Sequence, residues 1–304
     1  MLTVGRHVMQ GGRVHADDTV VPVLEPGLGR TRTARLWTYV RDDRPFGSAD
    51  PPAVLYRYSP DRRGEHPRAH LADFRGILQA GGYAGFAAVY GDGRVVEAAC
   101  PVSFADITPW DRFAMAHARR KFFDVHATTK SPLAHEALNR IAALYAIERE
   151  VRGSPAAERL HVRVARMAPL MAELHAWLRA TQARVPGRGD LAGAIRYSLS
   201  RWEALTLVLR DGRGCLDNSA AERAMRPIAL GRRNWTFAGS DAGGHRAAAI
   251  YSLIETAKLH GIDPEAYLRR VIGCIADYPV NRVQELLTWN LADLPARLDQ
   301  RMAA

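Results

Sequence analysis

The sequence predicts a mixed α/β fold that is interrupted by an all-helical block and followed by a small helical C-terminal region. Up to about residue 130, short segments rich in valine, tyrosine, tryptophan and threonine alternate with turn residues, as in strands. From 131 to 210 the apolar residues recur every three or four positions, as on amphipathic helices. Beyond 250 helical spacing returns, and Asp263-Pro264 is a typical helix start.

Five strands are expected in the first part of the chain. A Glu-Pro-Gly turn at 25–27 and the stretch 42–52 separate the first three, which predicts hairpin connections. Helices are expected at Pro67–Phe74, Tyr83–Tyr90 and Ala116–His126. The expected strands are Val14–Val23, Leu36–Val40, Ala53–Ser59, Gly76–Ala80 and Arg94–Cys100.

In the rest of the chain, helix-capping residues, prolines and glycines mark the expected boundaries of the helices. Ser154-Pro155 is expected to cap one helix of the block, and Asp190 another. After Gly214 we expect a short helix, then a basic, glycine-rich loop over Gly231–Gly244, and then two helices ending near Leu259 and Ala276. The predicted units are an α/β part at 1–130, an all-α insertion at 131–210, a helix that bears Glu222 with the basic loop at 211–250, and a helical region at 251–304.

Composition narrows the class of protein. The net charge is +10, and all but three of the 42 basic residues are arginines. Arginine binds phosphate through two parallel hydrogen bonds, which favours a DNA partner, although the codon usage of a GC-rich genome explains arginine over lysine equally well. No signal peptide, membrane span, disulfide framework or cysteine zinc site is expected. A reducing cytoplasm fits the three widely spaced cysteines, and a DNA partner would place the protein at the nucleoid.

The order of the predicted elements indicates where catalytic groups would lie. A first strand carrying an acid, two antiparallel strands, a helix and a fourth strand form the opening of a ribonuclease H-like sheet. That architecture places carboxylates on the first strand, at the end of the fourth strand and on a later helix. Together they bind two Mg²⁺ or Mn²⁺ ions about 3.5–4 Å apart, and such hard cations prefer oxygen ligands.

Asp17 and Asp18 lie inside the first predicted strand. Aspartate is disfavoured in a valine-rich strand, so its presence there calls for a reason. One reason is catalysis. The alternative is a strand with one face exposed to solvent. Because side chains alternate along a strand, one of the two aspartates would then point to solvent. Asp17 is the catalytic candidate.

Glu222 is the second candidate, on the later helix. Ser219 and Glu222 match an S-x-x-E capping box, in which the glutamate only caps the helix. If Asp217 or Asn218 is the cap instead, Glu222 lies inside the helix and is available for chemistry. The spacing leaves both interpretations open.

Six long runs carry a family resemblance. They are HADDTVVPVL, GRTRTARLWTYVRDDRPFG, YSPDRRGEHPRAHLADFRGILQA, AHARRKFFDVHA, LDNSAAERAMRPIALGRRNWTFAGSDAGG and SLIETAKLHGIDPEAYL. In the same order, they resemble the insertion-sequence 66 family of DDE transposases, over essentially the whole chain. The resemblance implies cleavage and strand transfer at transposon ends by two-metal phosphoryl transfer. It also places the first catalytic aspartate at Asp17 and the catalytic glutamate at Glu222.

The chain departs from the family pattern at the second catalytic aspartate. The family has it at the end of the fourth strand, where this chain has Gly81, which offers no side chain to a metal. Neither Asp73 nor Asp92 is an obvious substitute. An extra segment at 101–114, expected to be an exposed loop, and the missing N-terminal DNA-binding region of the family add to the departure. The sequence therefore predicts a truncated, catalytically impaired copy.

The basic residues expected to contact the DNA backbone lie in two parts of the chain. They are Arg119, Arg120, Arg223, Arg226, Arg232 and Arg233, whose alternative role is ordinary solvated charge. The expected partners are transposon ends and target DNA, bound by a homo-oligomer. Two alternatives to a transposase remain open: a non-catalytic DNA-binding remnant that acts as a regulator, and a resolvase-like nuclease on the same fold.

Overall fold

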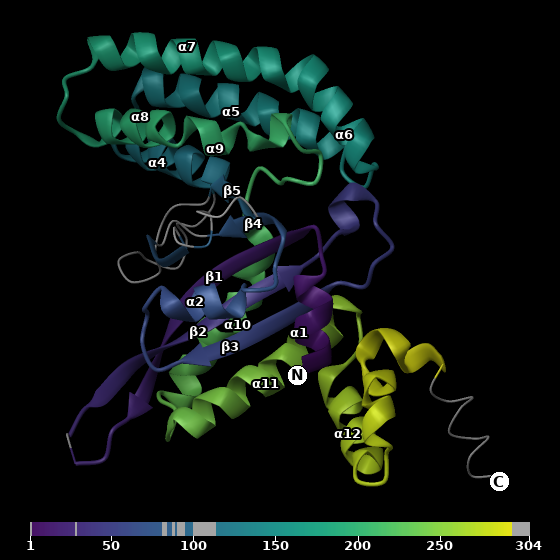
Figure 1. Ribbon diagram of the computed structural model, residues 1–304. Helices are drawn as coiled ribbons and strands as arrows, with labels where there is room; N and C mark the ends of the chain where they lie inside the picture. The colour runs from purple at the N-terminus through teal and green to yellow at the C-terminus, as the bar shows by residue number, and fades with distance from the viewer. Residues whose placement is uncertain are drawn as a thin grey trace.

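A mixed sheet with helices on both faces forms the middle of the molecule, with a stack of helices at one end and the C-terminal helices at the other (Figure 1). This arrangement confirms the prediction of an α/β chain. The computed structural model describes residues 2–27, 29–80, 84–86, 89, 95–99 and 114–293.

Five strands form one sheet in the order β3-β2-β1-β4-β5. The first three strands pair antiparallel as the predicted hairpins, and β4 and β5 run parallel to β1. The predicted strand positions are correct, although β1 and β2 are longer than expected. The strands are β1 (Arg13–Leu24), β2 (Thr31–Arg41), β3 (Ala53–Ser59), β4 (Gly76–Ala80) and β5 (Val95–Ala99).

The central strand β1 is covered on both faces. Helices α1 (Leu2–Met9) and α2 (Glu65–His70) lie on the face where Val14, Ala16 and Leu78 pack together. On the other face, helices α10 (Ser219–Trp235) and α11 (Asp241–Leu259) pack against the apolar side chains of the outer half of β1. Every residue from Arg13 to Thr19 is buried as a result, including charged ones.

Helix α11 (Asp241–Leu259) also covers the outer edge of the sheet. Strand β3 is the edge strand, and its free backbone N–H groups need partners. The N–H of Tyr56 donates to the hydroxyl of Ser252 at 2.8 Å, and the N–H of Val54 donates to Thr256 at 3.1 Å. Two hydroxyls one helical turn apart thus close the edge against further strand pairing.

The helical stack has its own apolar core. Phe122, Ile141, Leu144, Leu174 and Ile195 are buried in it, so the apolar stripes read from the sequence are core residues. A π-helical turn at 163–167 joins α6 to α7. The helices are α4 (Ala114–Thr129), α5 (Pro132–Glu150), α6 (Ala156–Val162), α7 (Ala168–Arg184), α8 (Asp190–Ser200) and α9 (Trp202–Leu205).

Two of the predicted helix caps are wrong and one is right. The cap position of α6 is Pro155 and not Ser154, and Asp190 is the first helical residue of α8, without a side-chain hydrogen bond at either cap. In the first turn Asp190 still opposes the positive end of the helix dipole. Asp263 caps its helix as expected, accepting from the N–H of Glu265 at 2.8 Å.

A buried ion cluster fastens the helical stack to the segment that leads into α10. The side chains of Arg159 and Arg163 are fully buried, and both contact the carboxylate of Glu148. Each also donates to the carbonyl of Gly214. Burial lowers the pKa of Arg163, which makes these paired contacts necessary for its charge.

The predicted basic loop is mostly helix. Helix α10 (Ser219–Trp235) continues past Gly231, and α11 begins at Asp241, so only 236–240 connect them. Two of its glycines, Gly231 and Gly244, lie in helices and serve close packing. A Cβ on Gly231 would lie 2.9 Å from the indole nitrogen of Trp235, and one on Gly244 would overlap the ring of Tyr58.

The C-terminal region consists of α12 (Pro264–Ile275) and 3-10 turns at Val280–Leu286 and Thr288–Asp293. Tyr267 fastens it internally by donating to the carbonyl of Leu286 at 3.1 Å. Within the described ranges, no helix combines the length and apolar character needed to cross a bilayer.

Three sequence predictions fall on parts of the chain that are not described. The helix predicted at Tyr83–Tyr90 is described only at 84–86 and 89. Gly81, and the extra segment up to residue 113, lie outside the described residues.

The packing of α11 on the sheet can be tested at its two adjacent glycines. Gly244→Ala should lower the free energy of unfolding by about 1–3 kcal/mol, because the new methyl group must displace the ring of Tyr58. Gly243→Ala is the matched control, since its Cβ would meet only the hydroxyl of Ser240 at 3.6 Å. The control should be neutral or slightly stabilising. Equal effects in urea unfolding would contradict this account of Gly244.

The half-buried His70 at the end of α2 makes stability depend on pH. Burial, with the charges of Arg57 and His66, lowers the pKa of His70 to about 3, while an unfolded histidine titrates near 6.5. Between these values the unfolded chain binds the extra proton, so stability falls as pH falls, by up to about 1.4 kcal/mol per pH unit.

The contribution of His70 to this pH dependence of stability can be measured by substitution. His70→Asn can keep a hydrogen bond to the Tyr39 hydroxyl, which lies 2.9 Å from Nδ1 of the histidine. We expect a shallower fall in unfolding free energy between pH 6.5 and 4.5 for this variant than for the parent chain. Parallel curves would show that His70 is protonated in the folded state.

Candidate functional site

The paired aspartates of β1 point to opposite faces of the sheet. Asp18 is 1% exposed and held by two arginines, Arg35 at 3.1 Å and Arg62 at 3.0 Å. Asp17 is 5% exposed and lies on the face that α10 covers. The expectation that one of the pair faces water is therefore wrong, because helices cover both faces. Asp18 is accounted for by its ion pairs, and Asp17 is the acid on the α10 face.

Asp17 sits among buried hydroxyl groups. Its Oδ1 accepts from the N–H of Asp18 at 2.8 Å. The cross-strand neighbour Thr38 and the next residue on the same face, Thr19, are fully buried. Neither hydroxyl has a hydrogen-bond partner among the described residues. Buried polar groups are rarely left unsatisfied, and such groups gather at functional sites.

The N-terminal end of α10 is fixed to β1 by Asn218. Its amide nitrogen donates to the carbonyl of Ala16 at 3.1 Å, and its Oδ1 lies 2.8 Å from Nδ1 of His15. Because the amide nitrogen already donates, the oxygen accepts, and the proton of the His15 ring is on Nδ1. Burial and the charge of Arg13 lower the pKa of His15 to about 3, so the ring is neutral.

Glu222 is not part of a capping box. The hydroxyl of Ser219 donates to Asp217, which also accepts from the N–H of Ser219 at 3.1 Å. Asn218 occupies the N-cap position, and α10 starts at Ser219. Glu222 thus lies inside the first turns of the helix, half-buried, one turn beyond Asn218.

Contacts further along α10 hold it against two strands of the sheet, β3 and β1. The hydroxyl of Tyr56 donates to the carbonyl of Ala224, and Arg232 donates to the carbonyl of Val20 at 2.7 Å. Glu222 lies between the anchor at Asn218 and the anchor at Ala224. The structure therefore places both candidate carboxylates on one pair of packed elements, β1 and α10.

The end of β4 also holds the segment that precedes α10. The amide of Gln79 donates to the carbonyls of Cys215 at 2.8 Å and Asp217 at 2.5 Å, and accepts from the N–H of Cys215 at 3.3 Å. Sequence reasoning missed Gln79 and the pair of His15 and Asn218. The available signal was polar residues at buried positions of two predicted strands.

The third acid of the family pattern has no counterpart in the described part of the chain. No cluster of three or more His, Cys, Asp or Glu side chains that could hold a metal occurs there. Asp73 is exposed in the turn before β4, so it lies at the end of that strand opposite to Gly81. Asp92 lies outside the described residues.

The predicted DNA contacts do not form one surface. Arg223, Arg226 and Arg233 are exposed on α10 at helical spacing, whereas Arg119 lies on α4. The remaining two have structural partners. Arg120 pairs with Asp124 at 2.8 Å, and Arg232 binds a carbonyl of β1.

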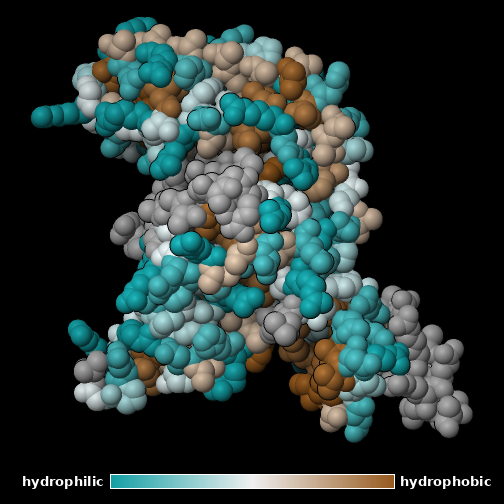
Figure 2. All heavy atoms as spheres, in the orientation of Figure 1, coloured by the Kyte–Doolittle hydropathy of each residue, from teal (hydrophilic) through white to brown (hydrophobic). Residues whose placement is uncertain are grey.

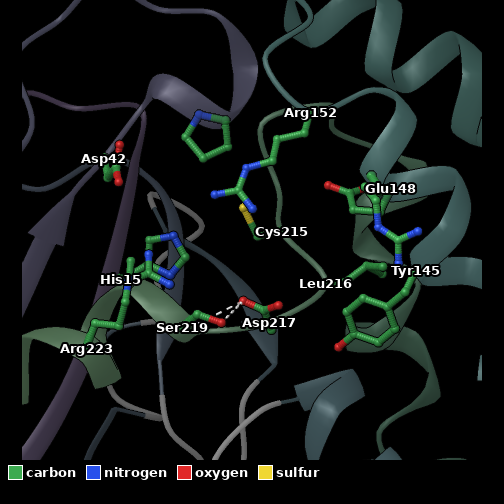
Figure 3. Close-up of a pocket in the computed structure, with 13 residues that line it drawn as sticks. His15, Asp42, Tyr145, Glu148, Arg152, Cys215, Leu216, Asp217, Ser219 and Arg223 are labelled. Carbon is green, nitrogen blue, oxygen red and sulfur yellow. Dashed lines mark hydrogen bonds between the residues drawn. The ribbon is translucent and has the colours of Figure 1, made fainter. Parts of the chain in front are cut away.

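A cavity of about 220 Å³ opens at the N-terminal end of α10 (Figure 3). Residues of α5, the end of β1 and the N-terminal end of α10 line it, including Tyr145, His15 and Ser219. Neither Asp17 nor Glu222 belongs to its lining.

Comparison with known proteins identifies the family. The sequence pattern of the Transposase IS66 family matches residues 2–246, and that of the IS66 C-terminal element matches residues 252–289. Two similar proteins come from Sinorhizobium fredii: uncharacterized protein y4hP is 45% identical over 295 residues, and uncharacterized protein y4qI is 38% identical over 291. Each alignment covers 93% of this chain and 51% of the relative.

The chain thus spans about half the length of the curated relatives it matches. No solved structure matches it. The two family patterns together cover most of the sequence, in the order in which the resembling runs occur. This chain belongs to the IS66 family of transposases.

Proposed function

We propose that this chain derives from the catalytic region of a transposase that cleaves and joins DNA by phosphoryl transfer, with Asp17 and Glu222 as its remaining catalytic carboxylates. The observation that carries the proposal is the buried acid in the central strand, covered by the helix that bears the second acid. The strand order, three antiparallel strands followed by two that run parallel to the first, supports a ribonuclease H-like catalytic domain.

We further propose that the residues present do not complete a two-metal site. Two carboxylates supply oxygen ligands of the kind that Mg²⁺ or Mn²⁺ prefers. Two divalent ions held close together need more negative charge than two carboxylates provide. Position 81, which would supply the third, is glycine. The present residues fix the site's geometry through Asn218, without a complete set of ligands.

The register of the sheet supports the importance of position 81. Ala16 and Ala80 are the last paired residues of β1 and β4, and Asp17 and Gly81 follow them in the sequence. Strand side chains alternate, and Gln79 points to the α10 face. One more residue of extended strand would thus direct a side chain at 81 toward the face of Asp17.

The exposed arginines of α10 are the proposed contacts to the DNA backbone, namely Arg223, Arg226 and Arg233. They lie on the helix that carries Glu222, so phosphates bound to them would run past the carboxylates. We propose transposon ends and target DNA as ligands, and a homo-oligomer as the assembly that holds them.

A second candidate function is DNA binding without catalysis. Gly81 favours it, because the arginines of α10 do not depend on the lost carboxylate. Such a protein would occupy transposon ends and compete with intact transposases.

The DNA interface can be tested through its dependence on salt. Each phosphate contact contributes about −0.9 to the log–log slope of affinity against salt for duplex DNA. Arg226→Glu with Arg233→Glu should weaken binding and flatten that slope. The control is Arg179→Glu with Arg184→Glu, which reverses two exposed charges on α7. Affinities are measured by fluorescence anisotropy. Equal changes in the two double variants would show that the DNA interface does not lie on α10.

The defect at position 81 can be tested by restoring the acid. The parent chain should cut no DNA in magnesium or manganese. Gly81→Asp should bind manganese more tightly, and at 100 times the dissociation constant the ion adds about 2.7 kcal/mol of stability. Gly82→Asp is the matched control, because it adds the same charge one position further along the chain.

Two results decide the outcome of this test. A manganese-dependent rise in melting temperature for Gly81→Asp alone supports the proposed site. Cleavage by the parent chain that is lost in Asp17→Asn would show that position 81 does not disable the site, and Asp73 and Asp92 would then be the acids to replace.

A further inference from the structure

Apart from Arg223, the groups that line the cavity between the helical stack and the sheet have no role in the proposed function. Its walls come from α5, from the segment before α10 and from the first turns of α10 (Figure 3). Figure 3 shows His15 and Arg223 on one side and Tyr145 and Glu148 on the other, with Asp217 between them. The cavity therefore joins the all-helical part of the chain to the element that carries Glu222.

Three guanidinium groups line this cavity without a partner. Arg149 and Arg152 come from the C-terminal end of α5 and the turn after it, and Arg223 comes from α10. All three are exposed, and none has a hydrogen bond or ion pair within the described part of the chain. Arginines that converge on a cavity without acidic partners are suited to phosphate.

Two acceptor groups in the cavity also lack partners. His15 is 3% exposed and its proton lies on Nδ1, so Nε2 is an acceptor to which no described residue donates. Asp217 uses Oδ1 for Ser219, and its Oδ2 has no partner among the described residues. The other acids in the lining, Asp42 and Glu148, already hold arginines.

The hydrogen-bond acceptors in the cavity and the arginines that line it together define the chemical class of its ligand. We infer that the cavity binds one unpaired nucleotide of the DNA, with an amino-bearing base against His15 and Asp217 and its phosphate on the arginines. Adenine, cytosine and guanine carry an exocyclic amino group with two N–H donors for these two acceptors, whereas thymine offers only its single ring N–H. This inference rests on the proposed function, in which DNA is the substrate.

The size of the cavity fits a single base. About 220 Å³ is below the roughly 300–1,000 Å³ typical of pockets for drug-sized ligands. A base pair within a duplex does not enter such a space, whereas an unstacked base does. The ligand is therefore a nucleotide at a single-stranded end or one turned out of the helix.

The site would position the strand relative to the carboxylates. His15 and Asp17 lie two residues apart on the same face of β1, and Asp217 lies just before the helix of Glu222. A nucleotide held in the cavity would thus place a neighbouring phosphate of its strand near Asp17 and Glu222. The helical stack contributes to this through Arg149 and Arg152.

Binding of DNA with different ends tests the inference. The probes are a blunt labelled duplex and the same duplex with a three-nucleotide single-stranded extension of adenine or thymine, measured by fluorescence anisotropy. The adenine extension should tighten binding by about tenfold over the thymine extension, the effect of one good hydrogen bond to a charged group. Asp217→Asn should remove this preference and leave blunt-duplex affinity unchanged.

The arginines are tested by a matched pair of double variants. Arg149→Ala with Arg152→Ala should remove the gain from the extension and flatten the salt slope by about 1.4, at about 0.7 per contact for a single strand. Arg179→Ala with Arg184→Ala removes the same charge from exposed positions of α7 and should keep the gain. Melting temperatures of all variants show that they fold.

The outcomes separate this inference from the proposed function. Duplex binding that is unaffected by any extension overturns the nucleotide site and leaves the proposed function standing. An equal loss in the control pair, or no preference between adenine and thymine in the parent chain, also overturns it. Failure to bind any of the DNA probes overturns both.

Discussion

The burial of strand β1 on both faces is the constraint on which the rest of the structure depends. A strand covered by helices on either side has no water to satisfy its polar groups, so each needs a partner from the protein. Asp18 takes two arginines, and His15 takes Asn218 from a helix 203 positions further along the chain. The polar residues of β1 thereby determine where α10 lies, and with it Glu222.

The position of α10 also depends on the helical stack. The segment before α10 is held by Gln79 of the sheet on one side and by the buried arginines Arg159 and Arg163 on the other. Removing one member of a buried ion cluster costs about 3–5 kcal/mol, because it leaves an uncompensated charge. The helical stack thus helps to hold α10 in place, although it contributes neither candidate carboxylate.

Local patterns predicted the strands well, because alternating and β-branched residues report directly on strand geometry. They also placed Asp17 and Glu222 on a strand and a helix. Local patterns failed where the role of a residue depends on packing against residues far away in the sequence. Gly231 and Gly244 read as a loop, and their real role, close approach to Trp235 and Tyr58, depends on residues brought together only by the fold. The partners of His15 and Gln79 lie more than 130 positions away, beyond any local pattern.

The contacts that hold the candidate site are independent of the acid that the family pattern requires at position 81. Asn218 binds Ala16 and His15, Arg232 binds Val20, and Gln79 binds the segment before α10, all through groups other than that carboxylate. The proposed loss of the acid would therefore remove negative charge from the site without removing any of these contacts. It would also remove a source of repulsion between carboxylates that are close together without a metal. A chain with glycine at 81 can thus keep the sheet, the placement of α10 and its exposed arginines, so the proposed DNA binding does not depend on the proposed chemistry.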